Sequence, residues 1–197
     1  FFKKNKGVGN FPKYKEKYIV VMHHPETTKF NETYVQIQQT IEAILKINNI
    51  KIVWLWPNID AGSDIISKQL RILRENKFAS NFSYFKNFSP EDYIKLIYNS
   101  ECLVGNSSSG IRESSFLSIP VVNIGSRQKK REQGFNVLNT GYKKKEIFKA
   151  IYKQMNKRKI KKSTIYGNGF ASKTIVKILS NILRKKISVE KVLNYLS

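Results

Sequence analysis

The chain has 197 residues, of which 41% are hydrophobic and 12% aromatic, and this apolar content is enough for a buried core and excludes global disorder. Thirty-six Lys and Arg residues against fourteen Asp and Glu residues give a formal net charge of +22, so polyanions, anionic membranes and phosphorylated ligands are the first partners to consider. The single cysteine, Cys102, excludes an intramolecular disulfide and a multi-cysteine metal site.

Two features bear on location and origin. No apolar run approaches the roughly 20 residues that span a bilayer, and residues 1–6 lack the apolar stretch of a signal peptide, so we expect a cytoplasmic protein and not a membrane protein. The chain begins with Phe1 rather than Met, which favours a fragment of a longer protein or a trimmed one. Lys and Asn are abundant throughout, so the amino-acid bias of an AT-rich genome explains the basicity as well as a binding surface does.

Apolar β-rich runs and amphipathic segments alternate along the chain. In chain order they predict a strand at 18–22, a helix at 31–48 capped by Asn31, a strand at 51–56, a helix at 63–76, a strand at 82–85, a helix opening at Ser89, a strand at 101–104, a helix at 111–117, a strand at 120–124, a further strand near 135–138, and helices at 143–155 and 172–183. This alternation predicts an α/β fold with a doubly wound parallel sheet and helices on both faces.

The residues that follow the predicted strands are unusually polar. Ligands of doubly wound sheets bind outside the carboxyl ends of the strands, so these positions are the candidates for a site. They are His23 and His24, then Asn58 and Asp60, then residues 106–109, and finally Arg127. Surface loops are polar as well, but this combination of residue types favours a ligand site.

The segment Gly105-Asn106-Ser107-Ser108-Ser109-Gly110 joins a predicted strand to a predicted helix. Free backbone N–H groups and Ser hydroxyls at such a junction can cradle a phosphate. The segment is neither a P-loop nor a Gly-x-Gly-x-x-Gly motif, and by itself it is more typical of an ordinary Ser-capped helix. Glu113, one turn later, either accepts hydrogen bonds from ribose hydroxyls or only compensates the helix dipole.

Arg127 and His24 are two residues of these loops whose side chains can donate hydrogen bonds to phosphate oxygens. A guanidinium just after Gly125 can clamp a diphosphate in a bidentate manner, although a solvated loop arginine is the alternative. His24 can donate to a phosphate oxygen or move a proton, whereas a structural role is the alternative. Side chains of adjacent residues diverge in a strand, so His23 and His24 do not predict a metal site.

The segment 143–162 is rich in lysine, a composition that also suits nucleic-acid binding. Its aromatic residues Phe148 and Tyr152 are four positions apart, which is typical of the buried face of a helix rather than a base-stacking surface. We therefore interpret this segment as a solvated lysine face.

Six short motifs follow one another along the chain. They are His24-Pro25-Glu26-Thr27-Thr28, Pro57-Asn58-Ile59-Asp60-Ala61-Gly62-Ser63, Gly105-Asn106-Ser107-Ser108-Ser109-Gly110-Ile111-Arg112-Glu113, Asn123-Ile124-Gly125-Ser126-Arg127-Gln128, Arg131-Glu132-x-Gly134-x-Asn136-Val137 and Tyr166-Gly167-Asn168-Gly169. In this order they resemble the UDP-N-acetylglucosamine 2-epimerases, especially the hydrolysing members of sialic-acid-type sugar pathways. The resemblance covers most of the chain, and six ordered motifs are far more specific than any single one.

The resemblance implies a glycosyltransferase-B-like architecture, in which two Rossmann-like halves close over a UDP-sugar and this chain is the C-terminal, UDP-binding half. Ser107 and Ser108 would hold phosphate oxygens, Glu113 the ribose, and the catalytic residues His24 and Arg127 the departing diphosphate. The implied UDP-binding residues are His24, Asn58, Tyr93, Ser107, Ser108, Glu113 and Arg127.

The reaction implied by the resemblance begins with loss of the C2 proton and elimination of UDP. Water then adds to the glycal-like intermediate to give N-acetylmannosamine. In the family the main acid and base groups come from the N-terminal half, so we expect this chain alone to bind UDP weakly and to catalyse nothing. The resemblance implies no cofactor and no metal, UDP and UDP-N-acetylhexosamine as ligands, and a homo-oligomer at full length.

The predicted organisation has three segments. Residues 1–16 are a linker or the start of a fragment, residues 17–170 the Rossmann-like UDP-binding domain, and residues 171–197 a C-terminal helical tail that packs on the N-terminal half. Glu26, Ser109 and the lysine-rich tail depart from the family pattern, and we expect none of them to touch a ligand contact.

Other functions stay open. Within the enzyme class, the alternatives are an epimerase of a UDP-diacetamido-trideoxy sugar and a non-hydrolysing UDP-sugar epimerase. Outside it, the alternatives are a non-catalytic UDP-sugar-binding domain and a basic nucleic-acid-binding module, whose binding would be steeply salt-dependent. The ordered motifs favour the UDP-sugar over nucleic acid as the partner.

Overall fold

The computed structural model describes residues 2, 4–13, 15–157 and 160–184. The chain divides into two compact units, residues 1–165 and residues 166–197. The second unit contains helix α6 (Ala171–Arg184), which agrees with the helix predicted at 172–183. The remainder of the predicted tail, residues 185–197, lies outside the described residues.

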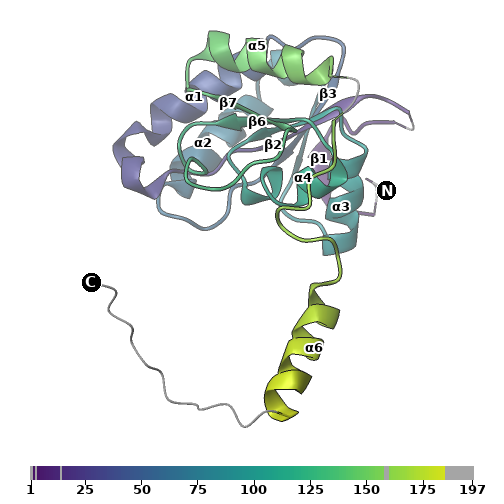
Figure 1. Cartoon of the computed structure of the whole chain (residues 1–197). Helices are drawn as coiled ribbons and strands as arrows, with labels where there is room; N and C mark the ends of the chain where they lie inside the picture. Colours follow the sequence, from purple (N-terminus) through teal and green to yellow (C-terminus); the bar gives the residue numbers. More distant parts are fainter. Residues whose placement is uncertain (1, 3, 14, 158–159, 185–197) are drawn as a thin grey trace. The chain divides into compact units, whose positions relative to one another are not determined.

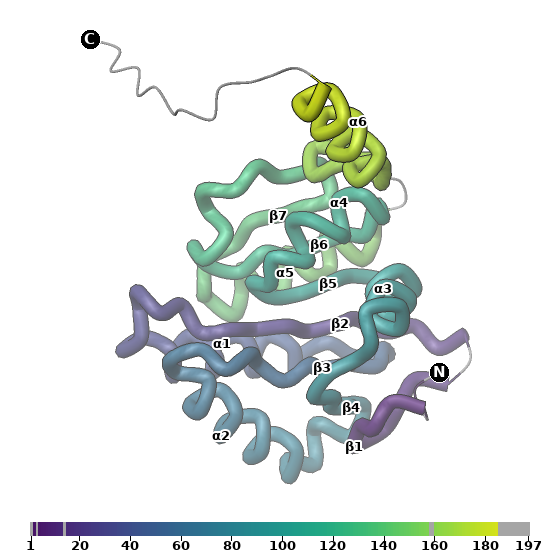
Figure 2. The backbone as a smooth tube through the Cα atoms, turned by 90° about the horizontal axis from the view of Figure 1, so that it is seen from below, coloured from purple at the N-terminus to yellow at the C-terminus, as the bar shows by residue number. Residues whose placement is uncertain are grey.

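A seven-stranded sheet forms the centre of the first unit (Figures 1 and 2). Its order is β1-β4-β3-β2-β5-β6-β7, and all neighbouring pairs are parallel except β1 with β4. The strands are β1 (Gly7–Gly9), β2 (Tyr18–Met22), β3 (Lys51–Leu55), β4 (Phe82–Phe85), β5 (Cys102–Gly105), β6 (Val121–Ile124) and β7 (Val137–Thr140). The six parallel strands have the order of a Rossmann fold, so the predicted fold class is confirmed.

Helices cover both faces of this sheet because its strands are apolar on both sides. Successive residues of β2 alternate between two cores: Ile19 and Val21 pack in one, and Tyr18 and Val20 in the other. The first core also receives α1 (Thr33–Ile44), α2 (Ser63–Arg74) and α5 (Lys144–Met155). The second receives α3 (Pro90–Tyr98) and α4 (Glu113–Leu117). The strand ends are therefore held from both sides.

Three predicted elements begin at a later residue in the structure than the sequence pattern indicated. The helix predicted at 31–48 is preceded by a 3-10 helix, η1 (Thr27–Glu32), which takes up the expected cap Asn31, so α1 begins at Thr33. The short helix predicted at 111–117 begins at Glu113, because a 3-10 helix, η3 (Ser108–Gly110), precedes it. The last strand lies two residues later than predicted, because Phe135 is 73% exposed.

The N-terminal segment contributes an unpredicted edge strand. Residues 7–9 pair antiparallel with β4, although the sequence pattern indicated a linker over residues 1–16. A Gly-Val-Gly tripeptide has none of the alternation that indicates a strand, so only the neighbouring strand reveals its role.

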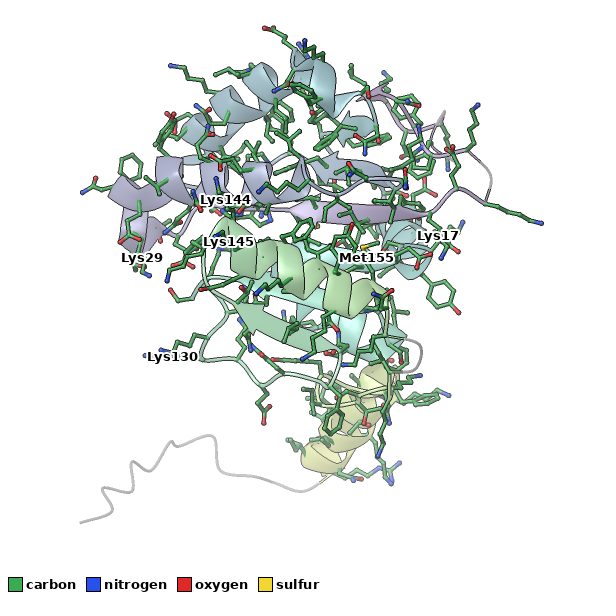
Figure 3. All side chains as sticks on the ribbon, turned by 90° about the horizontal axis from the view of Figure 1, so that it is seen from above. Lys17, Lys29, Lys130, Lys144, Lys145 and Met155 are labelled. Carbon is green, nitrogen blue, oxygen red and sulfur yellow. The ribbon has the colours of Figure 1, made fainter. Side chains whose placement is uncertain are left out.

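The basic side chains are spread over the surface. Lys17 and Lys130 come from two separate loops and Lys29 from η1, and their side chains point away from the ribbon in different directions (Figure 3). Lys143 and Lys144, at the start of α5, form ion pairs with Glu146 and Glu42 respectively. Within the described ranges, the structure contains no helix with the length and apolar character required to cross a membrane.

Candidate functional site

Strands β2 and β5 lie side by side where the strand order reverses, and both end at the same edge of the sheet. Met22, the last residue of β2, is in register with Gly105, the last residue of β5. Gly105 has φ of +135°, and a Cβ atom there would lie 1.9 Å from the Met22 carbonyl oxygen. Only glycine fits this close approach, which brings the loops after the two strands together.

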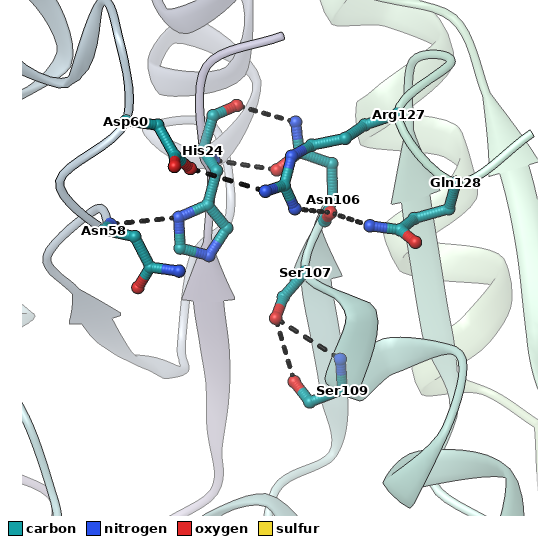
Figure 4. A network of polar contacts seen from close by, with 8 residues as sticks. All are labelled: His24, Asn58, Asp60, Asn106, Ser107, Ser109, Arg127 and Gln128. Atoms are coloured by element: carbon teal, nitrogen blue, oxygen red, sulfur yellow. Dashed lines mark hydrogen bonds and ion pairs between the residues drawn. The ribbon is translucent and has the colours of Figure 1, made fainter. Parts of the chain in front are cut away.

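Asn106 joins these two loops through its side chain (Figure 4). Its Oδ1 accepts a hydrogen bond from the His24 backbone N–H, and its Nδ2 donates to the His24 carbonyl, both at 2.7 Å. The Asn106 carbonyl in turn accepts from Gln128 Nε2 at 2.8 Å and from Arg127 Nη1 at 3.4 Å. One buried asparagine therefore connects the loops that follow β2, β5 and β6.

The same loops orient the imidazole of His24. The backbone N–H of Asn58 donates to His24 Nδ1 at 3.2 Å, so the neutral ring carries its proton on Nε2. Burial, together with the positive charge of Arg127, lowers the pKa of His24 to about 4 against the opposing effect of Asp60. At neutral pH His24 is thus an uncharged hydrogen-bond donor.

Arg127 places a guanidinium beside this histidine (Figure 4). Its Nη2 forms an ion pair with Asp60 Oδ2 at 3.4 Å, and its side chain is 30% exposed. Both of its side-chain contacts, to Asp60 and to the Asn106 carbonyl, are long for charged hydrogen bonds. The guanidinium therefore retains donors for an anion.

The segment from Gly105 to Gly110, the Ser turn, lies next to His24 in Figure 4. Ser107 Oγ caps η3 by accepting from Ser109 N–H at 3.4 Å, and it hydrogen-bonds with Ser109 Oγ at 3.0 Å. Tyr93 Oη hydrogen-bonds with Ser109 Oγ at 2.5 Å, and burial raises the pKa of Tyr93 to about 12. The turn therefore presents hydroxyls and N–H groups that are held by hydrogen bonds to one another and to Tyr93.

The structure brings most of the predicted site residues together. His24, Asn58, Ser107 and Arg127 lie in one neighbourhood in Figure 4, and Tyr93 is attached to it through Ser109. Ser108 is the first residue of η3 and is partly buried. Glu113 lies exposed in the first turn of α4, and no hydrogen bond within the described part of the chain joins it to the His24–Arg127 network.

Two expectations about neighbouring residues are wrong. Glu26 and Ser109 were expected to touch no site residue, yet Glu26 accepts from the Arg127 backbone N–H at 2.8 Å, and Ser109 bonds to both Ser107 and Tyr93. Asn106 was among the polar positions predicted after the strands, but the sequence pattern did not predict that its side chain joins the loops. Its position directly after the end of β5 was the available signal, because a buried amide there must find partners.

Acidification should destabilise the fold through the two histidines. Burial lowers the pKa of His23 to about 3 and that of His24 to about 4, so below the ordinary value near 6.5 only the unfolded chain takes up these protons. From pH 7 to pH 5 we expect the free energy of unfolding in urea to fall by about 2 kcal/mol per histidine. His23→Gln and His24→Gln should each remove one share of this loss. An unchanged slope in both variants would contradict the prediction.

No cluster of three or more His, Cys, Asp or Glu side chains in the described ranges could hold a metal ion. The site instead consists of hydrogen-bond donors: a guanidinium, an imidazole N–H, hydroxyls and backbone amides. Such a set suits an anion with several oxygen atoms, of which a diphosphate is an example.

The chain is similar in sequence to known proteins. It is 32% identical over 167 residues to the UDP-N,N'-diacetylbacillosamine 2-epimerase (hydrolyzing) of Legionella pneumophila, covering 85% of this chain and 43% of that protein. It is 30% identical over 154 residues to the UDP-N-acetylglucosamine 2-epimerase of Neisseria meningitidis serogroup B, covering 78% of this chain and 40% of that protein. The chain thus spans less than half the length of these curated relatives.

Among solved structures, the fold is similar to that of the UDP-GlcNAc 2-epimerase of Methanocaldococcus jannaschii, crystallised in complex with UDP-GlcNAc and UDP. The TM-score is 0.66 at 18% identity, over 84% of this chain and 46% of that one. The family profile described as UDP-N-acetylglucosamine 2-epimerase matches residues 3–180. The chain therefore belongs to the UDP-N-acetylglucosamine 2-epimerase family.

Proposed function

We propose that this chain is the UDP-binding half of a hydrolysing UDP-N-acetylglucosamine 2-epimerase. The observation that carries the proposal is the donor network at the reversal of the strand order, where His24, Arg127 and the Ser turn meet. A Rossmann-like sheet binds nucleotides at this position. The proposed ligand, UDP, carries the diphosphate that such donors recognise.

In this proposal each residue has a defined task. Ser107 and Ser108 hold phosphate oxygens, Glu113 accepts from the ribose hydroxyls, and Asn58 and Tyr93 line the site. Arg127 and the Nε2–H of His24 stabilise the negative charge that grows on UDP as its bond to the sugar breaks. These donors are oriented before the reaction, which is the condition for lowering a barrier by electrostatics.

The chemistry on the sugar is proposed to need a second half. Loss of the C2 proton with departure of UDP leaves a glycal-like intermediate, and addition of water then yields N-acetylmannosamine. Its acid and base groups are proposed to come from the N-terminal half of the family architecture. Helix α6 is proposed to contact that half, because its apolar residues Ile175, Leu179 and Leu183 are all exposed.

A UDP-diacetamido-trideoxy sugar is a second candidate substrate. The relative from Legionella pneumophila, named for UDP-N,N'-diacetylbacillosamine, is 32% identical to this chain. Since the two substrates share the UDP group, the residues described here suit both. Steady-state assays of a full-length enzyme with each sugar separate the candidates.

Calorimetric titration with UDP near physiological salt tests the nucleotide site. We expect saturable binding by the unsubstituted chain and weaker binding by Ser107→Ala, which loses a proposed phosphate contact. Ser100→Ala, which changes a partly buried serine after α3, is the control that should bind UDP normally. Absence of UDP binding, together with strong salt-sensitive binding of a random oligonucleotide, would contradict the proposal.

A further inference from the structure

The loop after β2 contains a buried carboxylate that the proposed reaction does not use. Glu26 is only 4% exposed and belongs to no ligand contact proposed above. Its hydrogen-bond partners lie 100 or more residues later in the chain, on the loops that follow β6 and β7, and Lys29 Nζ lies 4.0 Å from its Oε2. An ionised carboxylate is costly to remove from water, so a buried one needs hydrogen bonds or opposite charges that compensate for its burial.

Four hydrogen bonds to Glu26 meet this requirement. Oε1 accepts from the backbone N–H groups of Ser126 at 2.6 Å and Arg127 at 2.8 Å, and from Tyr142 Oη at 2.6 Å. Oε2 accepts from Ser126 Oγ at 2.7 Å. Burial raises the pKa of Glu26, but these donors outweigh burial and hold the pKa below its ordinary value. The group is therefore an anion at neutral pH.

The backbone before Arg127 is closed tightly onto this anion. Gly125 has φ of +78°, and a Cβ atom there would lie 2.2 Å from Tyr142 Oη and 2.7 Å from Glu26 Oε1. The Arg127 side chain, in contrast, makes two long polar contacts within the described residues, to Asp60 and the Asn106 carbonyl. The position of the guanidinium is thus set mainly by the backbone that Glu26 holds.

We propose that Glu26 is a positioning residue of the nucleotide site, whose buried carboxylate fixes the Ser126–Arg127 backbone and thereby aims the Arg127 guanidinium. This inference rests on the proposed function, because it acts on the same site. Glu26 is not a ligand contact, since its oxygens already accept four hydrogen bonds. It acts on UDP only through Arg127.

A double-mutant cycle on UDP affinity tests this route. Glu26→Gln keeps the shape of the side chain but removes its charge and one acceptor, and we expect UDP binding to weaken on the order of tenfold. In the background of Arg127→Ala the same change should weaken binding by less than about twofold, since the guanidinium it aims is gone. Glu75→Gln removes an equal charge from an exposed position and should bind UDP normally.

Tyr142→Phe provides a second test of the inference if Glu26→Gln destabilises the fold. Urea unfolding measures the stability of each variant. Tyr142→Phe removes one donor to Glu26 and leaves the carboxylate, so a smaller loss of UDP affinity is expected, again only when Arg127 is present. Equal losses with and without Arg127 would overturn the inference, as would unchanged affinity in both variants while Arg127→Ala weakens binding. Failure of the unsubstituted chain to bind UDP would instead overturn the proposed function itself and this inference with it.

Discussion

Arg127→Ala should weaken UDP binding by about 10- to 100-fold, because each hydrogen bond to a charged group contributes roughly 1.5–3 kcal/mol. The guanidinium can form such bonds, because 30% of its side chain is exposed and its contacts to Asp60 and the Asn106 carbonyl are long. Isothermal titration calorimetry measures the loss directly.

Lys130→Ala is the matched control for this measurement. It removes one positive charge from the same loop, but its side chain points away from the ribbon (Figure 3), so only a small, salt-sensitive change is expected. Equal losses in Arg127→Ala and Lys130→Ala would show that total charge rather than the site attracts UDP. The expected result is therefore a difference between two variants of equal net charge.

Gly105→Ala should be the most destabilising single substitution at the carboxyl edge of the sheet. The added Cβ would lie 1.9 Å from the Met22 carbonyl oxygen, a backbone atom of the neighbouring strand, in a backbone conformation that side chains rarely adopt. The central strands must separate to relieve this collision, so we expect a loss of about 4 kcal/mol or more in the free energy of unfolding. Urea unfolding followed by circular dichroism measures this loss.

Gly62→Ala separates backbone strain from collision. Gly62 also has a positive φ, +91°, but the three atoms nearest to its added Cβ would be side-chain atoms, at 3.2–3.4 Å. A loss of about 1–2 kcal/mol is expected for this variant from the conformation alone. Similar losses at the two positions would refute the close approach of β2 and β5 as the reason for a glycine at 105.

The parts of the fold that depend on local patterns were predictable. Fully apolar runs such as residues 18–22 indicated buried parallel strands, and the rule that ligands bind at strand ends then pointed to His24, Asn58 and Arg127. The strand β1 was not predictable, because its three residues owe their conformation to pairing with β4. Local pattern thus indicates an element only where the element carries its own apolar periodicity.

The hydrogen bonds that connect the loops of the site could not be predicted from the sequence, for a related reason. Glu26 and Ser126 are 100 residues apart, and nothing near either residue indicates the hydrogen bond between them. The same holds for Asn106 and the His24 backbone, 82 residues apart. Motifs identify the residues that line a site, whereas the residues that support it become visible only when the chain is folded.

These long separations also determine when the site can form during synthesis. His24 meets its partner Asn106 only after residue 106 has left the ribosome. Glu26 meets Ser126 and Arg127 only after the loop beyond β6 has followed, and Tyr142 only after β7. Contacts this distant in the chain must pay for closing a long loop before they stabilise anything, and they form late. A nascent chain that ends before residue 142 therefore lacks one of the four hydrogen bonds that hold Glu26 against the Arg127 backbone, and a ligand of this edge cannot guide the early steps of folding.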